Sequence, residues 1–389
     1  MKYIRPYWFW AITLLLVYTK LPAQTVIEGS FDHDGINRTY RLYIPEIYDA
    51  GTAVPLLFNL HGYGSNNIEQ EVYGDFRPVA DTANFIIAHP NGTTDFFNNR
   101  FWNTFGGADI DDVGFISALI DTISAAYNID SNRIYSTGMS NGGFMSYDLA
   151  CFLSHRIAAV ASVTGSMIWD RFNTCEPTHP TPVMQIHGTA DATVPYNGSF
   201  LFSHIDTLVS YWVNFNNCQP DPTIIQVPDI DTLDGCTAEQ HIYSGGNAGV
   251  SVEFFKVIDG GHSWPGAPIN LNVTNMDFDA SVEIWRFFSQ FSLDQLVNII
   301  GEETIVSRLM KAYPNPAGNT LILDFPAFER PVAAMLEVYN LHGQPIHSQN
   351  ISDLQHQTIL DVSAWPPGMY LLRVKAMNGI TVDWKVMVR

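Results

Sequence analysis

The chain has 389 residues and is 46% hydrophobic, so it is long enough for two folded domains and apolar enough for a large core. Its 19 basic and 39 acidic side chains give a formal charge of -20 at pH 7. This charge repels phosphate backbones and anionic lipid headgroups, so nucleic acid is excluded as an expected partner.

The first 23 residues have the pattern of a secretory signal peptide. Lys2 and Arg5 precede an apolar run over residues 7–18, and Leu21-Pro22-Ala23 supplies a cleavage site before Gln24. We expect cleavage after Ala23, with an uncleaved anchor as the alternative. No later segment has the roughly 18 apolar residues that a membrane-spanning helix needs. The mature chain is therefore expected to be secreted or held at the cell surface, without stable membrane insertion.

Residues 24–292 are predicted to form one α/β domain. A hairpin over residues 25–31 and 40–44 comes first, joined through Asp34-Gly35. Short apolar runs then alternate with helix-length segments, at residues 54–60, 85–89, 133–137, 158–163, 182–187 and 250–257. Helices are expected at residues 113–127, 144–152, 199–215 and 278–291. This alternation predicts a mostly parallel sheet flanked by helices.

A different pattern follows near Leu293. Residues 293–309 are predicted to be a linker, and Tyr313-Pro314-Asn315-Pro316 marks the start of a second domain, residues 310–389. Short β-type runs occur there at residues 320–324, 336–339, 358–362, 369–374 and 381–388. Their turn-bounded spacing predicts a small all-β sandwich.

The segment Gly138-Met139-Ser140-Asn141-Gly142 fits a G-x-S-x-G nucleophile elbow. It follows a predicted strand and precedes a predicted helix, which places Ser140 on a sharp strand-to-helix turn. The pentapeptide alone also occurs in ordinary glycine-rich turns. Its context, together with two suitable partners downstream, favours a catalytic serine.

A serine hydroxyl needs a base to take its proton and a carboxylate to orient that base. His262 follows the predicted strand 250–257, and Asp191 follows the predicted strand 182–187. The chain order Ser140, Asp191, His262 is the order of the α/β-hydrolase fold. His61 and His187 also end strands, and we expect them to shape loops through hydrogen bonds instead.

An oxyanion hole is expected from two backbone N–H groups. The N–H of Asn141 is one candidate. The other lies in the loop His61-Gly62-Tyr63-Gly64, where we favour the N–H of Tyr63 over that of Gly62. The side chains of Trp102 and Trp264 are candidates for the substrate pocket, with core packing as an equal alternative.

The acidic residues Asp109, Asp111 and Asp112 precede a predicted helix, so helix capping is favoured over metal binding. The cysteines Cys151, Cys175, Cys218 and Cys236 show no spacing for metal ligands. In an exported chain they allow three pairings as two disulfides, and loop closure favours Cys151 with Cys175 and Cys218 with Cys236. No metal and no cofactor are expected.

These motifs together resemble the polyhydroxybutyrate depolymerase and feruloyl esterase family. They are His61 to Gly64, Asp109 to Phe115, Gly138 to Gly143, His187 to Tyr196 and Gly261 to Gly266. The resemblance implies an α/β-hydrolase fold, a cofactor-free carboxylic ester hydrolase, the same three catalytic residues and the same two disulfides.

The tail resembles the C-terminal sorting domain of type IX secretion, from Tyr313-Pro314-Asn315-Pro316 through Pro367-Gly368-Met369-Tyr370 to Lys385-Val386. This resemblance implies a secretion machinery as partner and export across the outer membrane. A carbohydrate- or polymer-binding sandwich is the alternative.

For the whole chain we predict a secreted serine esterase acting on feruloyl or acetyl esters of plant cell-wall polysaccharide. Polyhydroxybutyrate depolymerisation is the alternative reaction. A non-catalytic polymer-binding adhesin is the alternative from another class.

Overall fold

The computed structural model describes residues 25–269, 273–299, 311–324, 334–340, 343–351, 357–376 and 381–389. The predicted signal peptide, residues 1–23, lies outside the described residues, as does most of the predicted linker. No helix within these ranges is both long and apolar enough to cross a membrane. Below, residues 25–299 are called the large domain and residues 311–389 the small domain.

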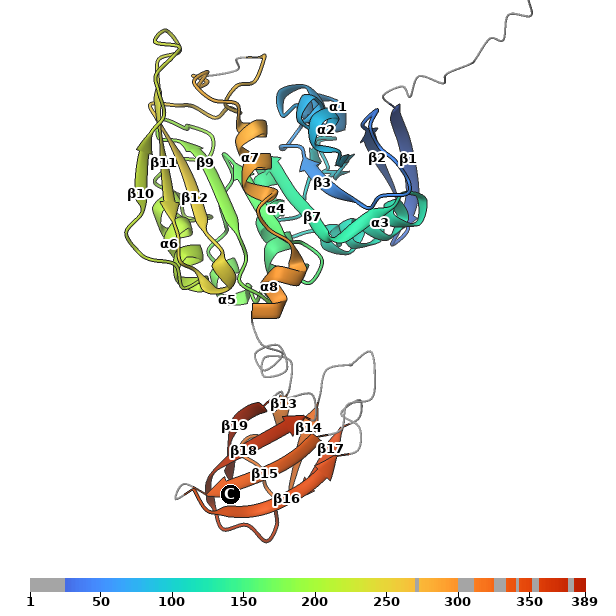
Figure 1. Cartoon of the computed structure of the whole chain (residues 1–389), viewed down its shortest axis with the longest axis vertical. Coiled ribbons are helices and arrows are strands. Elements are labelled where there is room, and N and C mark those ends of the chain that lie inside the picture. The colour runs from blue at the N-terminus through green and yellow to red at the C-terminus, as the bar shows by residue number, and fades with distance from the viewer. Residues whose placement is uncertain are drawn as a thin grey trace, which may run out of the picture.

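A ten-stranded sheet forms the centre of the large domain (Figure 1). In sheet order the strands are β1 (Thr25–His33), β2 (Ile36–Ile44), β4 (Ile86–Pro90), β3 (Val54–Leu60), β7 (Ile129–Met139), β8 (Ala159–Val163), β9 (Val183–Gly188), β12 (Val252–Ile258), β11 (Thr237–Tyr243) and β10 (Thr223–Gln226). The run from β4 to β12 is parallel, and the pairs at both margins are antiparallel. The carboxyl ends of the parallel strands therefore open at one edge, which we call the catalytic edge.

Helices cover both faces of this sheet. The helices are α1 (Asn67–Tyr73), α2 (Arg77–Ala83), α3 (Asp112–Ala126), α4 (Asn141–Phe152), α5 (Arg171–Thr174), α6 (Ile205–Phe215), α7 (Ala280–Phe288) and α8 (Leu293–Ile299). Neighbouring residues of β7 show the two layers, since successive strand side chains point to opposite faces. The Tyr135 ring stacks on Phe288 of α7 at 5.0 Å, whereas Ser136 Oγ lies 2.9 Å from Ser146 Oγ of α4. The predicted mostly parallel sheet flanked by helices is confirmed.

The small domain consists of two antiparallel sheets (Figure 1). One contains β13 (Lys311–Tyr313), β14 (Thr320–Asp324) and β17 (Thr358–Asp361); the other contains β16 (Pro345–Ile351), β15 (Ala334–Asn340), β18 (Gly368–Ala376) and β19 (Thr381–Val388). Leu321 and Leu360 of the first sheet share one apolar core with Leu336 and Leu372 of the second. The predicted all-β sandwich is therefore confirmed.

The cysteines divide into one disulfide and two thiols. Cys151 is bonded to Cys175, as predicted, and this bond ties the end of α4 to the residue after α5. The predicted bond between Cys218 and Cys236 is wrong, because both are buried free thiols. Cys236 directly precedes the first residue of β11, whereas Gln219, next to Cys218, bonds Ser244 just past the last residue of β11. Seven residues of extended strand, roughly 23 Å, separate these positions.

We expect non-reducing mass mapping to find the Cys151–Cys175 link alone. Cys218 and Cys236 should react with iodoacetamide only after unfolding, because both side chains are buried. Reducing the bond, which closes a sequence separation of 24, should destabilise the large domain by about 3 kcal/mol. A Cys218–Cys236 peptide pair in the digest would contradict the pairing.

Each domain has its own apolar core, so we expect the large domain to fold without the small one. A chain covering Gln24 to Glu303 should keep a cooperative melt, and it should keep the ester hydrolysis that the sequence predicts. The measurement is differential scanning calorimetry together with hydrolysis of a p-nitrophenyl ester. A folded truncated chain without turnover would contradict the independence of the two domains.

Candidate active site

Ser140 occupies a strained turn between β7 and α4. Its φ of 55° and ψ of -118° lie in a region that non-glycine residues rarely adopt. The flanking glycines make this turn possible, because a Cβ on Gly138 or Gly142 would lie 2.6 Å or 2.2 Å from the carbonyl oxygen of Leu60. The turn thus presents the serine hydroxyl at the catalytic edge, as the elbow motif predicts.

His262 and Asp191 are joined by a hydrogen bond at the same edge. His262 Nδ1 lies 2.7 Å from Asp191 Oδ2, and the Asp191 side chain is fully buried. The backbone N–H groups of Thr193 and Val194 each donate to Asp191 Oδ1 at 2.8 Å. These two donors hold the carboxylate in place, so it accepts from Nδ1–H and the imidazole keeps Nε2 as its basic nitrogen.

His187 shapes the loop that carries Asp191. Its Nε2 lies 2.8 Å from the carbonyl oxygen of Val194, and its Nδ1 lies 3.0 Å from the Gln185 side-chain amide. Burial lowers the pKa of His187 to about 4, so the ring is neutral at pH 7, donating through Nε2 and accepting through Nδ1. The predicted loop-shaping role is confirmed.

The loop from His61 to Gly64 borders Ser140. A Cβ on Gly62 would lie 3.4 Å from Ser140 Cβ. His61 fixes this loop, since its Nδ1 donates to the carbonyl oxygen of Gly62 at 2.7 Å and its Nε2 accepts from the N–H of Gly92 at 2.9 Å. Burial lowers the pKa of His61 to about 4, which keeps this neutral pattern at pH 7. The loop is therefore rigidly placed beside the nucleophile.

The two predicted oxyanion residues belong to the two segments that border Ser140, the loop with Gly62 and the start of α4. Asn141 is the first residue of α4, and N–H groups in the first turn of a helix have no acceptor inside the helix. Its side chain is locked by bonds to the N–H and the carbonyl of Trp102, at 2.7 and 3.1 Å. Tyr63 follows Gly62, and its exposed ring is held by a 2.6 Å bond from its hydroxyl to Asp95.

The two candidate pocket tryptophans lie in the core instead of at the surface. Trp102 is 0% exposed and Trp264 is 2% exposed. Trp102 Nε1 donates to the carbonyl oxygen of His61 at 2.9 Å, and Trp264 Nε1 donates to Ser281 Oγ at 3.2 Å. The interpretation of these side chains as pocket walls is therefore corrected. Through its bond to His61, the buried Trp102 supports the loop next to Ser140 from the core side.

A small apolar cluster, separate from the main core, lies next to the nucleophile. It consists of Phe144, Val194 and Phe202, with Ile168 packed against it. Phe144 is one helical turn after Ser140, and its N–H donates to the Ser140 carbonyl oxygen at 3.0 Å. Val194 belongs to the Asp191 loop, so the cluster joins the helix that follows the nucleophile to the loop that carries the acid. Sequence reasoning missed it, because its members come from three separate loops and helices.

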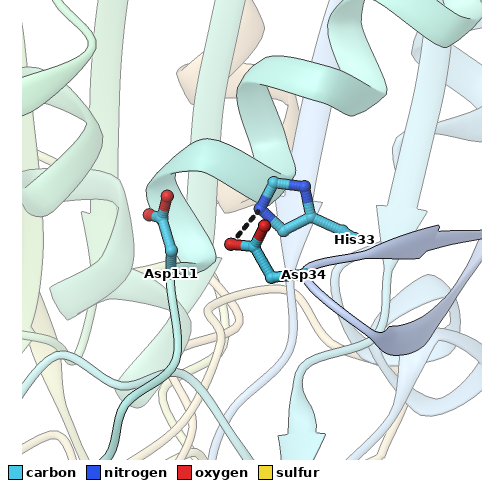
Figure 2. A group of neighbouring side chains, drawn as sticks. All are labelled: His33, Asp34 and Asp111. Atoms are coloured by element: carbon cyan, nitrogen blue, oxygen red, sulfur yellow. Dashed lines mark ion pairs between the residues drawn. The ribbon is translucent and has the colours of Figure 1, made fainter.

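A group of side chains with metal-ligand chemistry lies where the β1–β2 hairpin meets the start of α3 (Figure 2). His33 Nε2 is 3.6 Å from Asp34 Oδ2, and one oxygen of Asp111 lies within 4.8 Å of these atoms. Asp111 caps α3, since its Oδ1 accepts from the N–H of Gly114 at 2.7 Å, so the predicted capping is confirmed for Asp111, whereas the carboxylate of Asp112 accepts from Arg38 and from the N–H of Asn103. The positive end of the α3 helix dipole repels a bound cation here. The Asp34 side chain is also 71% exposed, so it is not held in a fixed position for a metal. We assign no metal to this group.

The parallel sheet, the strained serine after β7 and the buried His–Asp pair after β12 and β9 define an α/β-hydrolase. Comparison with known proteins gives the same class. Residues 49–216 match the family described as Phospholipase/Carboxylesterase, and residues 311–389 match the secretion system C-terminal sorting domain.

Feruloyl esterase C of Emericella nidulans is 31% identical over 267 residues, covering 66% of this chain and 86% of that protein. Probable feruloyl esterase C of Aspergillus clavatus is 32% identical over 259 residues, covering 64% and 83%. A bifunctional acetylxylan esterase/xylanase of Neocallimastix patriciarum is 26% identical over 267 residues, but the chain spans only 35% of its length.

Among solved structures, acetyl xylan esterase from Aspergillus awamori has the same fold. Its TM-score is 0.50 at 13% identity, covering 68% of this chain and 99% of that one. The chain belongs to the phospholipase/carboxylesterase family of ester hydrolases and carries a C-terminal secretion sorting domain.

Proposed function

We propose that this protein is an exported serine esterase that cleaves carboxylic esters through an acyl-enzyme. Ser140 Oγ attacks the ester carbonyl carbon while His262 Nε2 takes the hydroxyl proton. The N–H groups of Tyr63 and Asn141 stabilise the negative oxygen of the tetrahedral intermediate. The C–O bond then breaks, and His262 returns the proton to the leaving alcohol. Water attacks the acyl-enzyme by the same route and releases the acid.

The observation that carries this proposal is the 2.7 Å bond between His262 and buried Asp191, at the edge where Ser140 holds a strained conformation. A buried carboxylate bonded to Nδ1 fixes the tautomer that a general base requires and stabilises the imidazolium that forms. A backbone conformation that costs energy persists only where the surrounding structure holds it, and such positions cluster at active sites.

The proposed substrates are feruloyl or acetyl esters on plant cell-wall polysaccharide. The names of the relatives support this class, since they include feruloyl and acetylxylan esterases. The ring of Phe105 is 45% exposed and lies 5.1 Å from the ring of Phe144, one helical turn after Ser140, so it supplies an apolar wall for an aromatic or short acyl group. The buried cluster of Phe144, Val194 and Phe202 supports this wall.

Cleavage of polyhydroxybutyrate is the second candidate. Phe96 is 95% exposed and Phe200 is 89% exposed, and both lie on loops after parallel strands. Exposed aromatic rings at the catalytic edge could adsorb to a hydrophobic polyester surface. The small domain is proposed to bring the chain to a secretion machinery as its partner, without taking part in catalysis.

The test is a side-by-side assay of the full chain on methyl ferulate, acetylated xylan and short polyhydroxybutyrate oligomers. Turnover of one of the first two with none on the oligomers supports the polysaccharide esterase. Turnover of the oligomers alone replaces it with the depolymerase. A fluorophosphonate probe labels an activated serine stoichiometrically, so failure to label would favour the non-catalytic adhesin.

A further inference from the structure

A pocket opens at the catalytic edge, beside the loop that holds Tyr63. Its volume is about 420 Å³, and it lies between residues 36–39 of β2 and residues 91–100 after β4. Tyr40 of β2 pairs with Pro90, the last residue of β4, so residues 36–39 extend beyond the carboxyl end of that strand. The pocket is therefore on the same edge of the sheet as Ser140.

The pocket shares a wall with the oxyanion loop. The N–H of Gly92 donates to His61 Nε2 at 2.9 Å, and the N–H of Gly64 donates to the carbonyl oxygen of Arg100 at 2.8 Å. The hairpin of β5 (Thr93–Thr94) and β6 (Arg100–Phe101) thus supports the loop with its backbone and lines the pocket. Three strand spacings, roughly 14 Å, separate β2 from β7. A polymer attached to an ester at Ser140 can reach this distance.

The pocket is lined by asparagine amides and threonine hydroxyls, which both donate and accept hydrogen bonds, and by two arginine guanidiniums, which only donate. These side chains belong to Asn37, Arg38, Thr39, Asn91, Thr93, Thr94 and Arg100. The apolar side chains among its walls are those of two isoleucines, and none of its walls is an aromatic ring. Such a lining fits hydroxyl groups, which donate and accept, better than polyester repeats, which only accept.

Two polar atoms in the walls of this pocket have no hydrogen-bond partner among the described residues. Thr93 Oγ1 and Arg38 Nε are buried without a hydrogen bond. Arg100 donates to the carbonyl oxygen of Gly92 at 3.2 Å, but no carboxylate of the described residues lies within 4.0 Å of it. The other seven arginines of the large domain all pair with carboxylates. Buried polar groups are normally satisfied, so unpaired ones around a pocket indicate a polar ligand.

We propose that this pocket binds a neutral sugar residue of the polysaccharide that carries the scissile ester. The proposal rests on the function proposed above and names the leaving-group side of its substrate. Asp34 and Asp111 lie two residues before Ile36 and one after Ile110, at the margin of the pocket. Their charges, together with the net charge of -20, disfavour an acidic sugar. Their oxygens are further acceptors for sugar hydroxyls.

The test is the double variant Asn37→Ala/Thr94→Val in the full chain. Both side chains are exposed, and neither makes a hydrogen bond within the described residues, so the variant should fold normally. We expect KM on feruloylated or acetylated xylo-oligosaccharide to rise about tenfold, since several hydrogen bonds to the sugar are lost. Hydrolysis of methyl ferulate or p-nitrophenyl acetate should stay within twofold. Asn132→Ala, in a pocket of about 390 Å³ at the opposite end of β7, is the matched control and should change neither.

Equal kinetics of the variant and the wild type on both substrates would overturn the sugar pocket while leaving the esterase intact. Equal losses on both substrates would overturn it too, because the residues would then act through the oxyanion loop. A rise in KM only for oligosaccharides that contain uronic acid would replace the neutral sugar with an acidic one. If the wild type itself hydrolyses no polysaccharide ester, the proposed function fails instead.

Discussion

Replacing Ser140 with alanine is expected to lower kcat on a p-nitrophenyl ester by on the order of 10³-fold or more. The hydroxyl is the proposed nucleophile, and alanine keeps the backbone turn without it. His262→Ala should cause a loss of the same order. Asp191→Asn should cost less, because the amide keeps the buried shape but favours the wrong tautomer of His262.

Ser131→Ala is the matched control for this prediction. Ser131 belongs to the same strand, β7, but is exposed near its opposite end, so its loss should leave turnover unchanged. Labelling with a fluorophosphonate should disappear in Ser140→Ala and persist in Ser131→Ala. A folded Ser140→Ala protein that still hydrolyses the ester would rule out the proposed mechanism.

Features encoded within one short segment could be predicted from the sequence. The strand before Ser140, the helix after it and the glycines between them all lie within residues 129–152, so local rules were enough. The strand 54–60 was predicted with its observed bounds for the same reason. The predicted helix 199–215 instead begins at Ile205, because Leu201 to Ser203 bond back to the loop after β8.

Features that depend on depth or on distant contacts could not be predicted. The alternation of apolar and polar residues along a strand shows which face of the strand is buried. It does not show whether a tryptophan near a catalytic loop reaches solvent. Trp102 and Trp264 therefore could not be told apart from pocket walls. The predicted disulfide between Cys218 and Cys236 rested on their short separation along the chain. In the structure, β11 holds the two cysteines apart in space.

Three buried histidines, His61, His89 and His187, lie at or near the carboxyl ends of parallel strands, and we call them the histidine layer. The sequence predicted only part of this layer. His61 and His187 were expected to shape loops, but His89 on β4 was not singled out. Its Nε2 lies 3.2 Å from Asn59 Nδ2, and its Nδ1 is buried without a partner among the described residues. Because burial dominates all three environments, it lowers the pKa of each ring to about 4. The charges of nearby groups, such as Arg41 and Glu71 around His89 and Asp191 beside His187, have smaller effects.

This layer predicts that the large domain loses stability in mild acid. Between pH 6.5 and pH 4 the unfolded chain binds protons at these histidines while the folded chain keeps them neutral, so stability falls as the pH falls. Above pH 6.5 both states are neutral, and the stabilising difference is fully present. As the pH falls from 7 to 5, each of these histidines is expected to lower the free energy of unfolding by about 2 kcal/mol.

Urea unfolding followed by near-ultraviolet circular dichroism at pH 7, 6 and 5 measures this loss. His89→Gln should weaken the pH dependence by about 2 kcal/mol, because glutamine cannot take up a proton in the unfolded chain. His204→Gln, at a partly exposed site, is the control for the loss of any histidine. Its free energy of unfolding should keep more of the pH dependence than that of His89→Gln. The same pH dependence in His89→Gln as in the wild type would contradict a neutral His89 ring in the folded chain at pH 5.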